Sequence, residues 1–227
     1  MANPAGGPSM PSPANDDPLK RQLRSGGFGA YFAPLPGADE EVRRIASYFP
    51  RGTSTVVSGG SATEAAYRSR AGDADILHFA THAVASDSQP FYSTLILAPD
   101  AKAGDDGFLQ AYEVLRTPLR AGLVVLSGCE TARGSEDWGQ GLVGLAAAFE
   151  QAGAQSVLAT LWSIDESTAD IMAAFYMAMA QGAPASAALR QAKLQVMQKR
   201  IRLGNVDISL AHPFFWAPFK LIGAAGR

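Results

Sequence analysis

The chain has 227 residues, of which 47% are hydrophobic and 18% are charged, so it can enclose a sizeable core within one domain. A net charge of −2 and a pI of about 5.9 give no electrostatic reason to expect nucleic acid as a partner. The single cysteine excludes an internal disulfide and a multi-cysteine zinc site, and three dispersed histidines without paired acids argue against a metal centre. The chain starts without signal-peptide features and its apolar stretches are too short to span a bilayer, so we expect a cytoplasmic protein without membrane association.

Residues 1–30 are rich in proline, glycine, serine and asparagine and lack hydrophobic periodicity, so we expect a flexible segment before a domain over residues 31–227. Helices are expected over residues 39–49, 64–69, 111–115, 142–151, 166–180 and 185–203. Strands are expected over residues 53–58, 75–81, 94–97, 123–126, 155–161 and 216–222. This alternation of strands and helices predicts an α/β sandwich with a mostly parallel central sheet.

Two of the predicted strands stop at a reactive side chain. One is Ile76-Leu-His-Phe-Ala-Thr-His82, and the other is Leu123-Val-Val-Leu-Ser-Gly-Cys-Glu-Thr-Ala-Arg-Gly134. A thiol needs a nearby base to become a thiolate, which is the nucleophilic form. Because neighbouring parallel strands bring their carboxyl ends to one edge of the sheet, we expect His82 and Cys129 to meet there.

A lone cysteine is more often a small buried hydrophobe than a nucleophile. Cys129 lies after its strand rather than within it, between Gly128 and a Glu-Thr-Ala-Arg-Gly turn. Gly128 permits a close backbone approach, and N–H groups of this turn could stabilise a developing oxyanion. This context favours the nucleophile interpretation.

The other histidines are interpreted as structural. Side chains alternate along a strand, so His78 is expected to face the interior and to be hydrogen-bonded there. His212 is expected to be a turn residue before the last strand. The end of a strand has access to substrate, so His82 is the candidate base.

Asp165 and Glu166 follow a third strand at the same predicted edge of the sheet. Acids at the N-terminal end of a helix are usually explained by the helix dipole alone. Their position also permits a second role, as an acidic pocket for a basic substrate side chain.

Six motifs in this order resemble the CHAT domain, a caspase-like domain related to separase and often attached to tetratricopeptide repeats. The resemblance extends over about residues 35–223, and the motifs are His-Phe-Ala-Thr-His82, Leu-Ser-Gly-Cys129-Glu-Thr-Ala, Gln140-Gly-Leu-Val-Gly-Leu, Ala147-Ala-Phe-Glu-Gln-Ala-Gly-Ala154, Leu161-Trp-Ser-Ile-Asp165 and His212-Pro-Phe-Phe-Trp-Ala-Pro-Phe219. The 47 positions that separate His82 from Cys129 are close to the roughly 50 found in caspases.

The resemblance implies a caspase-like three-layer sandwich and a cysteine peptidase that uses a Cys–His dyad without metal or cofactor. It makes His82 the general base and Cys129 the nucleophile. It makes the backbone N–H groups of Cys129 and Ala83 the oxyanion donors, and Asp165 or Glu166 the acid that receives a basic residue before the scissile bond. The expected partners are a protein or peptide substrate and a repeat-containing regulatory protein.

Two departures from the family pattern favour an alternative, a catalytically inactive or partner-activated interaction module. Ala83 stands where the family usually has glycine, and alanine disfavours a positive φ. The opening Met-Ala-Asn-Pro resembles the end of the family's first strand, so we expect a sheet that lacks this strand and has an exposed edge.

Overall fold

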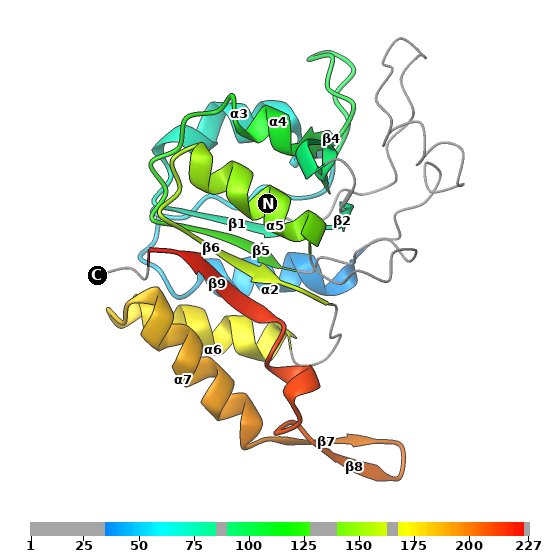
Figure 1. The fold of residues 1–227 in the computed structure, drawn as a ribbon, viewed down its shortest axis with the longest axis vertical. Helices are drawn as coiled ribbons and strands as arrows, with labels where there is room; N and C mark the ends of the chain where they lie inside the picture. The colour runs from blue at the N-terminus through cyan, green and yellow to red at the C-terminus, as the bar shows by residue number, and fades with distance from the viewer. Residues whose placement is uncertain (1–34, 85–89, 128–139, 163–167, 225–227) are drawn as a thin grey trace.

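The computed structural model describes residues 35–84, 90–127, 140–162 and 168–224, and it has a four-stranded central sheet (Figure 1). The strand order is β1 (Ile76–Ala80), β5 (Leu123–Ser127), β6 (Ser156–Thr160) and β9 (Phe219–Gly223). The first three strands are mutually parallel and β9 is antiparallel to β6. The predicted α/β class and the mostly parallel sheet are therefore confirmed.

Helices cover both faces of this sheet (Figure 1). One face carries α3 (Glu64–Arg70), α4 (Ala111–Val114) and α5 (Gln140–Gln151), and the other carries α2 (Pro36–Ala46), α6 (Thr168–Ala180) and α7 (Ala185–Met197). Alternate residues of β5 enter the two resulting cores. Val124 and Leu126 pack with the first set of helices, whereas Leu123 and Val125 pack with the second. The near-continuous apolar character of this strand is thus explained by burial on both faces.

Two small antiparallel units lie outside the central sheet. One sheet consists of β2 (Ala83–Val84), β3 (Thr94–Ile96) and β4 (Phe108–Gln110), and a separate hairpin consists of β7 (Arg200–Leu203) and β8 (Val206–Ser209). The prediction of one helix over residues 185–203 is wrong beyond Met197, where α7 ends. A two-residue turn containing Gly204 at φ +60° reverses the chain and lets β7 pair with β8.

The strand predicted over residues 53–58 is not formed. Residues 54–58 belong to no helix, strand or turn. No strand of the described residues lies between this segment and β1. Residues 53–57 and 74–79 instead both line one cavity of about 640 Å³. A segment becomes a strand only when a neighbour accepts its backbone hydrogen bonds, and among the described residues this neighbour is lacking.

In the part of the chain that the structure describes, no helix has both the length and the apolar character needed to cross a bilayer.

Candidate functional site

The register of the central sheet relates the two strands that precede the candidate dyad. Ala80 of β1 is paired with Ser127 of β5, each the last residue of its strand. His82 lies two residues after Ala80, and in the sequence Cys129 lies two residues after Ser127. The chain therefore leaves the two neighbouring strands at one level of the sheet, with both reactive residues at the same offset.

The backbone around His82 is held against β3. The His82 carbonyl oxygen accepts a hydrogen bond of 2.8 Å from the Ile96 N–H, and the Thr81 hydroxyl donates to the Ile96 carbonyl. The residue His82 is only 5% exposed. These contacts restrain the histidine where the chain passes from the central sheet into the small sheet.

Ala83 follows His82 and pairs with Leu95 in the small sheet. Hydrogen-bonded and non-bonded pairs alternate along an antiparallel ladder, and the neighbouring pair of His82 and Ile96 is hydrogen-bonded. Ala83 and Leu95 therefore form a non-bonded pair, so the Ala83 N–H points away from β3. No non-glycine residue in the described ranges has a positive φ, so the backbone at Ala83 does not use the conformation for which glycine would be needed.

The other predicted site residues lie outside the described residues: Gly128, Cys129, Asp165 and Glu166. The structure does describe the strands that lead to these residues. β5 ends at Ser127, and the chain after β6 continues to Trp162, whose indole N–H donates to the Phe214 carbonyl at 3.0 Å. Trp162 also packs against the Phe214 ring, with 6.4 Å between ring centroids.

His78 belongs to a buried polar network, as predicted from its inward-facing position. Its Nδ1 lies 2.9 Å from the Tyr176 hydroxyl, and its Nε2 lies 3.1 Å from Glu41 Oε1. The same carboxylate oxygen accepts a hydrogen bond of 2.7 Å from the Ser127 hydroxyl. The Glu41 side chain, 12% exposed, thus joins α2 to the last residue of β5 and to β1.

Glu41 was not among the residues singled out from the sequence. The signal was present, because Glu41 shares the helix face of Ala38, Val42 and Ile45, which are all buried. Burial by itself raises the pKa of the Glu41 carboxyl, but the contacts with His78 and Ser127 outweigh it and lower the pKa below its ordinary value. Burial, together with the charge of Glu41, raises the pKa of Tyr176.

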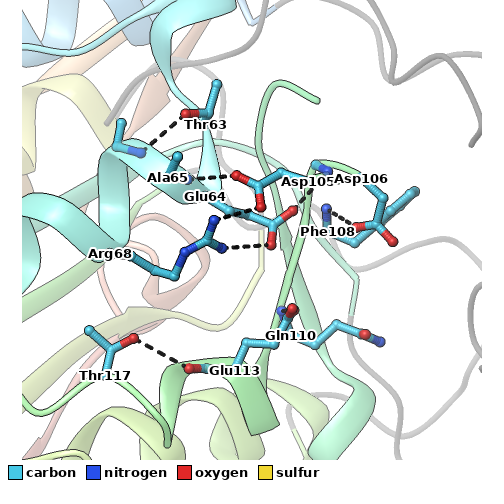
Figure 2. Close-up of polar contacts among 12 residues, drawn as sticks. Thr63, Glu64, Ala65, Arg68, Asp105, Asp106, Phe108, Gln110, Glu113 and Thr117 are labelled. Carbon is cyan, nitrogen blue, oxygen red and sulfur yellow. Dashed lines mark hydrogen bonds and ion pairs between the residues drawn. The ribbon is translucent and has the colours of Figure 1, made fainter. Parts of the chain in front are cut away.

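A second polar cluster ties α3 to the turn before β4 (Figure 2). Glu64, which is 3% exposed, accepts a hydrogen bond of 2.9 Å from the Gly107 N–H. Arg68 lies 2.6 Å from Asp105 but 3.5 Å from Glu64, so its charge is directed chiefly to Asp105. The second Asp105 oxygen accepts from the Ala65 N–H at 2.8 Å.

The protonation of Glu64 is unusual for a carboxyl group. Burial, together with the nearby charges of Glu113, Asp106 and Asp105, raises its pKa to about 8, against the opposing hydrogen bond from Gly107. Among the described residues, no group of three or more histidine, cysteine, aspartate or glutamate side chains is arranged to hold a metal ion. The contacts from Glu64 to Gly107 and from Asp105 to Ala65 and Arg68 clamp α3 to the turn before β4, and the raised pKa keeps Glu64 largely protonated at neutral pH.

His212 has the turn position predicted for it. It precedes the short 3₁₀ segment Pro213–Phe215, and its Nδ1 accepts a hydrogen bond of 3.2 Å from the Phe214 N–H. This contact caps the turn that leads into β9.

Comparison with known proteins identifies a family and relatives of this chain. The profile of the CHAT domain matches residues 14–224. Tetratricopeptide repeat protein 28 of Mus musculus is 28% identical over 256 aligned residues, which cover 99% of this chain and 10% of the relative. Tetratricopeptide repeat protein 28 of Homo sapiens is 29% identical over 256 residues, which cover 99% of this chain and 9% of the relative. The chain thus spans about a tenth of the length of these relatives.

Proposed function

The chain belongs to the CHAT domain family, and on this basis we propose that it is a cysteine endopeptidase that uses a dyad of Cys129 and His82. The family has a fold related to the caspase-like cysteine peptidases. The observation that carries the proposal is the pairing of Ala80 with Ser127, because the two candidate residues follow these positions at an equal offset of two residues. Residues with this offset on adjacent parallel strands emerge at the same edge of the sheet, where such sites form.

In the proposed mechanism, His82 takes the proton of the Cys129 thiol, and the resulting thiolate attacks the carbonyl carbon of the scissile peptide bond. The backbone N–H groups of Cys129 and Ala83 stabilise the tetrahedral oxyanion, and Gly128 allows the backbone to approach the substrate closely. His82 then protonates the leaving amine, and a water molecule hydrolyses the acyl-enzyme and restores the thiol.

The direction of the Ala83 N–H supports its part in this mechanism. An N–H that pairs within a sheet is not available to an oxyanion, and Ala83 occupies a non-bonded position opposite Leu95. The extended backbone at this position also means that replacing the family's usual glycine with alanine does not strain the chain.

For the substrate, we propose a protein or peptide with a basic residue before the scissile bond, received by Asp165 or Glu166. Both acids follow β6 in the sequence, and β6 is the parallel neighbour of β5. A carboxylate that pairs with a guanidinium in two hydrogen bonds would select arginine over neutral side chains. A tetratricopeptide-repeat protein is the proposed regulatory partner, because the relatives carry this name.

The decisive test is a cleavage assay with pooled peptides that carry Arg or Lys, or else Asp, before the scissile bond. We expect selective cleavage after the basic residues, and a loss of roughly 10³-fold or more in Cys129→Ala and His82→Gln. His212→Asn is the matched control, since asparagine can still cap the turn and His212 lies outside the dyad. Cleavage after Asp alone would keep the mechanism but reject the acidic pocket.

A second readout separates an unactivated peptidase from an inactive module. At pH 7 the rate of alkylation of Cys129 by iodoacetamide reports its thiolate fraction. We expect this rate to fall in His82→Gln and to be unchanged in His212→Asn. Absence of cleavage by folded protein, together with an alkylation rate that does not depend on His82, would reject the peptidase and favour an interaction module.

A further inference from the structure

The chain passes from the central sheet into the small sheet through two residues, Thr81 and His82. β1 ends at Ala80, and β2 begins at Ala83. Both connecting residues are buried, with Thr81 1% and His82 5% exposed. The position of the proposed base therefore depends on the contacts that hold this short link between the two sheets.

Two hydrogen bonds tie the link to one residue of β3. The Ile96 N–H donates to the His82 carbonyl oxygen at 2.8 Å, and the Thr81 hydroxyl donates to the Ile96 carbonyl oxygen. The N–H and C=O of one residue in an antiparallel strand point to the same side, so Ile96 holds both residues of the link from that side. We call this pair of hydrogen bonds the Ile96 bracket.

The Ile96 bracket also fixes the peptide group between His82 and Ala83. The described residues contain no cis peptide bond, and in a trans peptide the C=O and the N–H point in opposite directions. Because the His82 C=O points to β3, the Ala83 N–H points away from it, in agreement with the pairing of Ala83 and Leu95. The bracket thus sets both the backbone of the proposed base and the direction of the proposed oxyanion donor.

Thr81 supplies the part of the bracket that comes from a side chain. Threonine is β-branched, so the number of rotamers open to a buried Thr81 is small. Its hydroxyl is the donor to the carbonyl of Ile96, which is fully buried, and a buried carbonyl requires a partner. Valine has nearly the same shape but has no hydroxyl to donate. The contribution of the hydrogen bond can therefore be separated from that of the shape.

We propose that Thr81 is a positioning residue of the peptidase, which holds the His82 backbone and the Ala83 N–H in the geometry that the reaction requires. This inference rests on the proposed function, because the proposed base and the proposed oxyanion donor are the groups that Thr81 positions. A displacement of about 1 Å in such groups can lower the rate by about 10²-fold. In this role Thr81 acts through the backbone of the two residues that follow it.

The kinetic test compares Thr81→Val, which removes the donor, with Thr81→Ser, which keeps the hydroxyl. We expect Thr81→Val to lower kcat for the basic peptides by about 10- to 100-fold with a change in KM of less than about twofold. Thr81→Ser should retain kcat to within about threefold. Thr94→Val is the matched control, because Thr94 is also fully buried in the small sheet and its hydroxyl donates to the Leu95 carbonyl at 3.2 Å. This control should leave kcat unchanged.

Amide hydrogen exchange of Ile96, measured by NMR, tests the bracket without any cleavage. The Ile96 N–H is the donor to the His82 carbonyl, so its exchange rate reports whether the bracket is closed. We expect Thr81→Val to accelerate this exchange by about tenfold or more relative to the amides of β5 and β6. Thr81→Ser and Thr94→Val should leave it unchanged. Thr81→Ala also lacks the hydroxyl, and it should give the same effects if Thr81→Val does not fold.

Three results would overturn the proposal. One is an equal loss of kcat in Thr81→Val and Thr94→Val, which would reflect general destabilisation of the small sheet. Another is a Thr81→Ser variant as slow as Thr81→Val, which would show that shape and not the hydroxyl matters. The third is Ile96 exchange that does not change in Thr81→Val.

Alkylation of Cys129 by iodoacetamide distinguishes failure of this inference from failure of the proposed function. We expect Thr81→Val to lower the alkylation rate toward that of His82→Gln, and Thr94→Val to leave it unchanged. A rate that depends on His82 but not on Thr81 would reject the positioning role and keep the dyad. A rate that does not depend on His82, in a protein that cleaves no peptide, would reject the proposed function itself and this role with it.

Discussion

At the residue scale, buried carboxyl groups connect separate parts of the fold, and their environments push their pKa values in opposite directions. Glu41 has charged and hydroxyl partners in His78 and Ser127, which lower its pKa. Glu64 lies among other acids and has a raised pKa of about 8. The charged form of Glu41 and the neutral form of Glu64 are thus the forms favoured by folding.

For Glu64, stability should decline with rising pH. The folded-state pKa of about 8 lies above the ordinary value of 4.5, so its contribution is fully present below pH 4.5 and is lost as the pH rises through 8. Glu64→Gln is neutral at every pH. In urea unfolding at pH 5, 7 and 9, the free energy of unfolding of the variant should rise relative to that of the wild type as the pH rises. This relative increase is limited to about 1.4 kcal/mol per unit of pKa shift.

The exposed Asp207→Asn, in β8, is the control for this experiment and should follow the wild-type curve. A Glu64→Gln variant whose free energy of unfolding parallels that of the wild type at all three pH values would contradict the raised pKa of Glu64.

For Glu41 the sign is reversed. Its folded-state pKa lies below 4.5, so its contribution is present above that pH and is lost as the pH falls through the folded-state value. Glu41→Gln removes the charge that His78 and Ser127 contact. We expect this variant to lower the free energy of unfolding by about 1.5–3 kcal/mol at pH 7, and by less in acid.

The neighbouring Glu40→Gln is the matched control, because Glu40 is exposed on the same helix. A destabilisation by Glu41→Gln that is equally large at pH 3 and pH 7 would show that shape rather than charge determines its contribution.

At the element scale, the helix end at Gly153 determines where the chain enters β6. The Ala154 N–H donates to the Phe149 carbonyl at 3.0 Å and the Gly153 N–H donates to the Glu150 carbonyl at 3.0 Å, which is the Schellman pattern. Gly153 has a φ of +119°, and a Cβ there would lie 2.3 Å from the Leu119 carbonyl oxygen. Both conformation and space therefore require glycine.

Gly153→Ala should thus destabilise the protein more than the same substitution at a glycine where only the positive φ, and not lack of space, disfavours alanine. Gly182 has a φ of +93°, and a Cβ at this position would meet no atom of another part of the chain within 4 Å. Gly182→Ala therefore reports backbone strain alone, of about 1–3 kcal/mol. We expect Gly153→Ala to lower the melting temperature further than Gly182→Ala does. Equal losses would mean that the Leu119 backbone moves aside at no cost.

At the scale of the whole molecule, one sheet joins two cores, so damage to either core should unfold both. Leu126 of β5 is buried in the core that contains α5, and Leu158 of β6 is buried in the core that contains α6. Leu126→Ala and Leu158→Ala should each lower the free energy of unfolding by about 2–5 kcal/mol. Tryptophan fluorescence and far-UV circular dichroism should give one coincident transition for each variant.

Separated transitions by the two probes would contradict this coupling and would show that the α6 and α7 layer unfolds independently. The conservative Leu126→Met and Leu158→Met are the controls, since they keep volume in the same positions and should cost less than about 1.5 kcal/mol.

The sequence alone predicted the elements whose signals are local. β5 and β6 were predicted because they are short apolar runs, and α3 was predicted over residues 64–69. In the structure the Thr63 hydroxyl caps this helix and accepts from the Ala66 N–H at 3.1 Å. The expectation that His78 is a hydrogen-bonded interior residue and the turn position of His212 were also confirmed. Each rests on alternation along a strand or on immediate neighbours.

The elements that were missed depend on partners distant in the sequence. β2 and β4 have only two and three residues, and they become strands because β3 lies between them. The reverse error occurred at residues 53–58, which have strand-like composition but no described strand beside them. Pairing, rather than propensity, decides such short segments.

By itself, the sequence determined the alternating architecture, the family and the two strand ends that carry His82 and lead to Cys129, because periodicity and contiguous motifs are local properties of the chain. Only the tertiary structure decided that Ala80 and Ser127 share one level of the sheet, that Glu41 reaches His78 and Ser127, and that Glu64 is buried among acids. These features arise from contacts between residues far apart in the sequence. Register, burial and charge neighbourhood are set only when those residues are packed together.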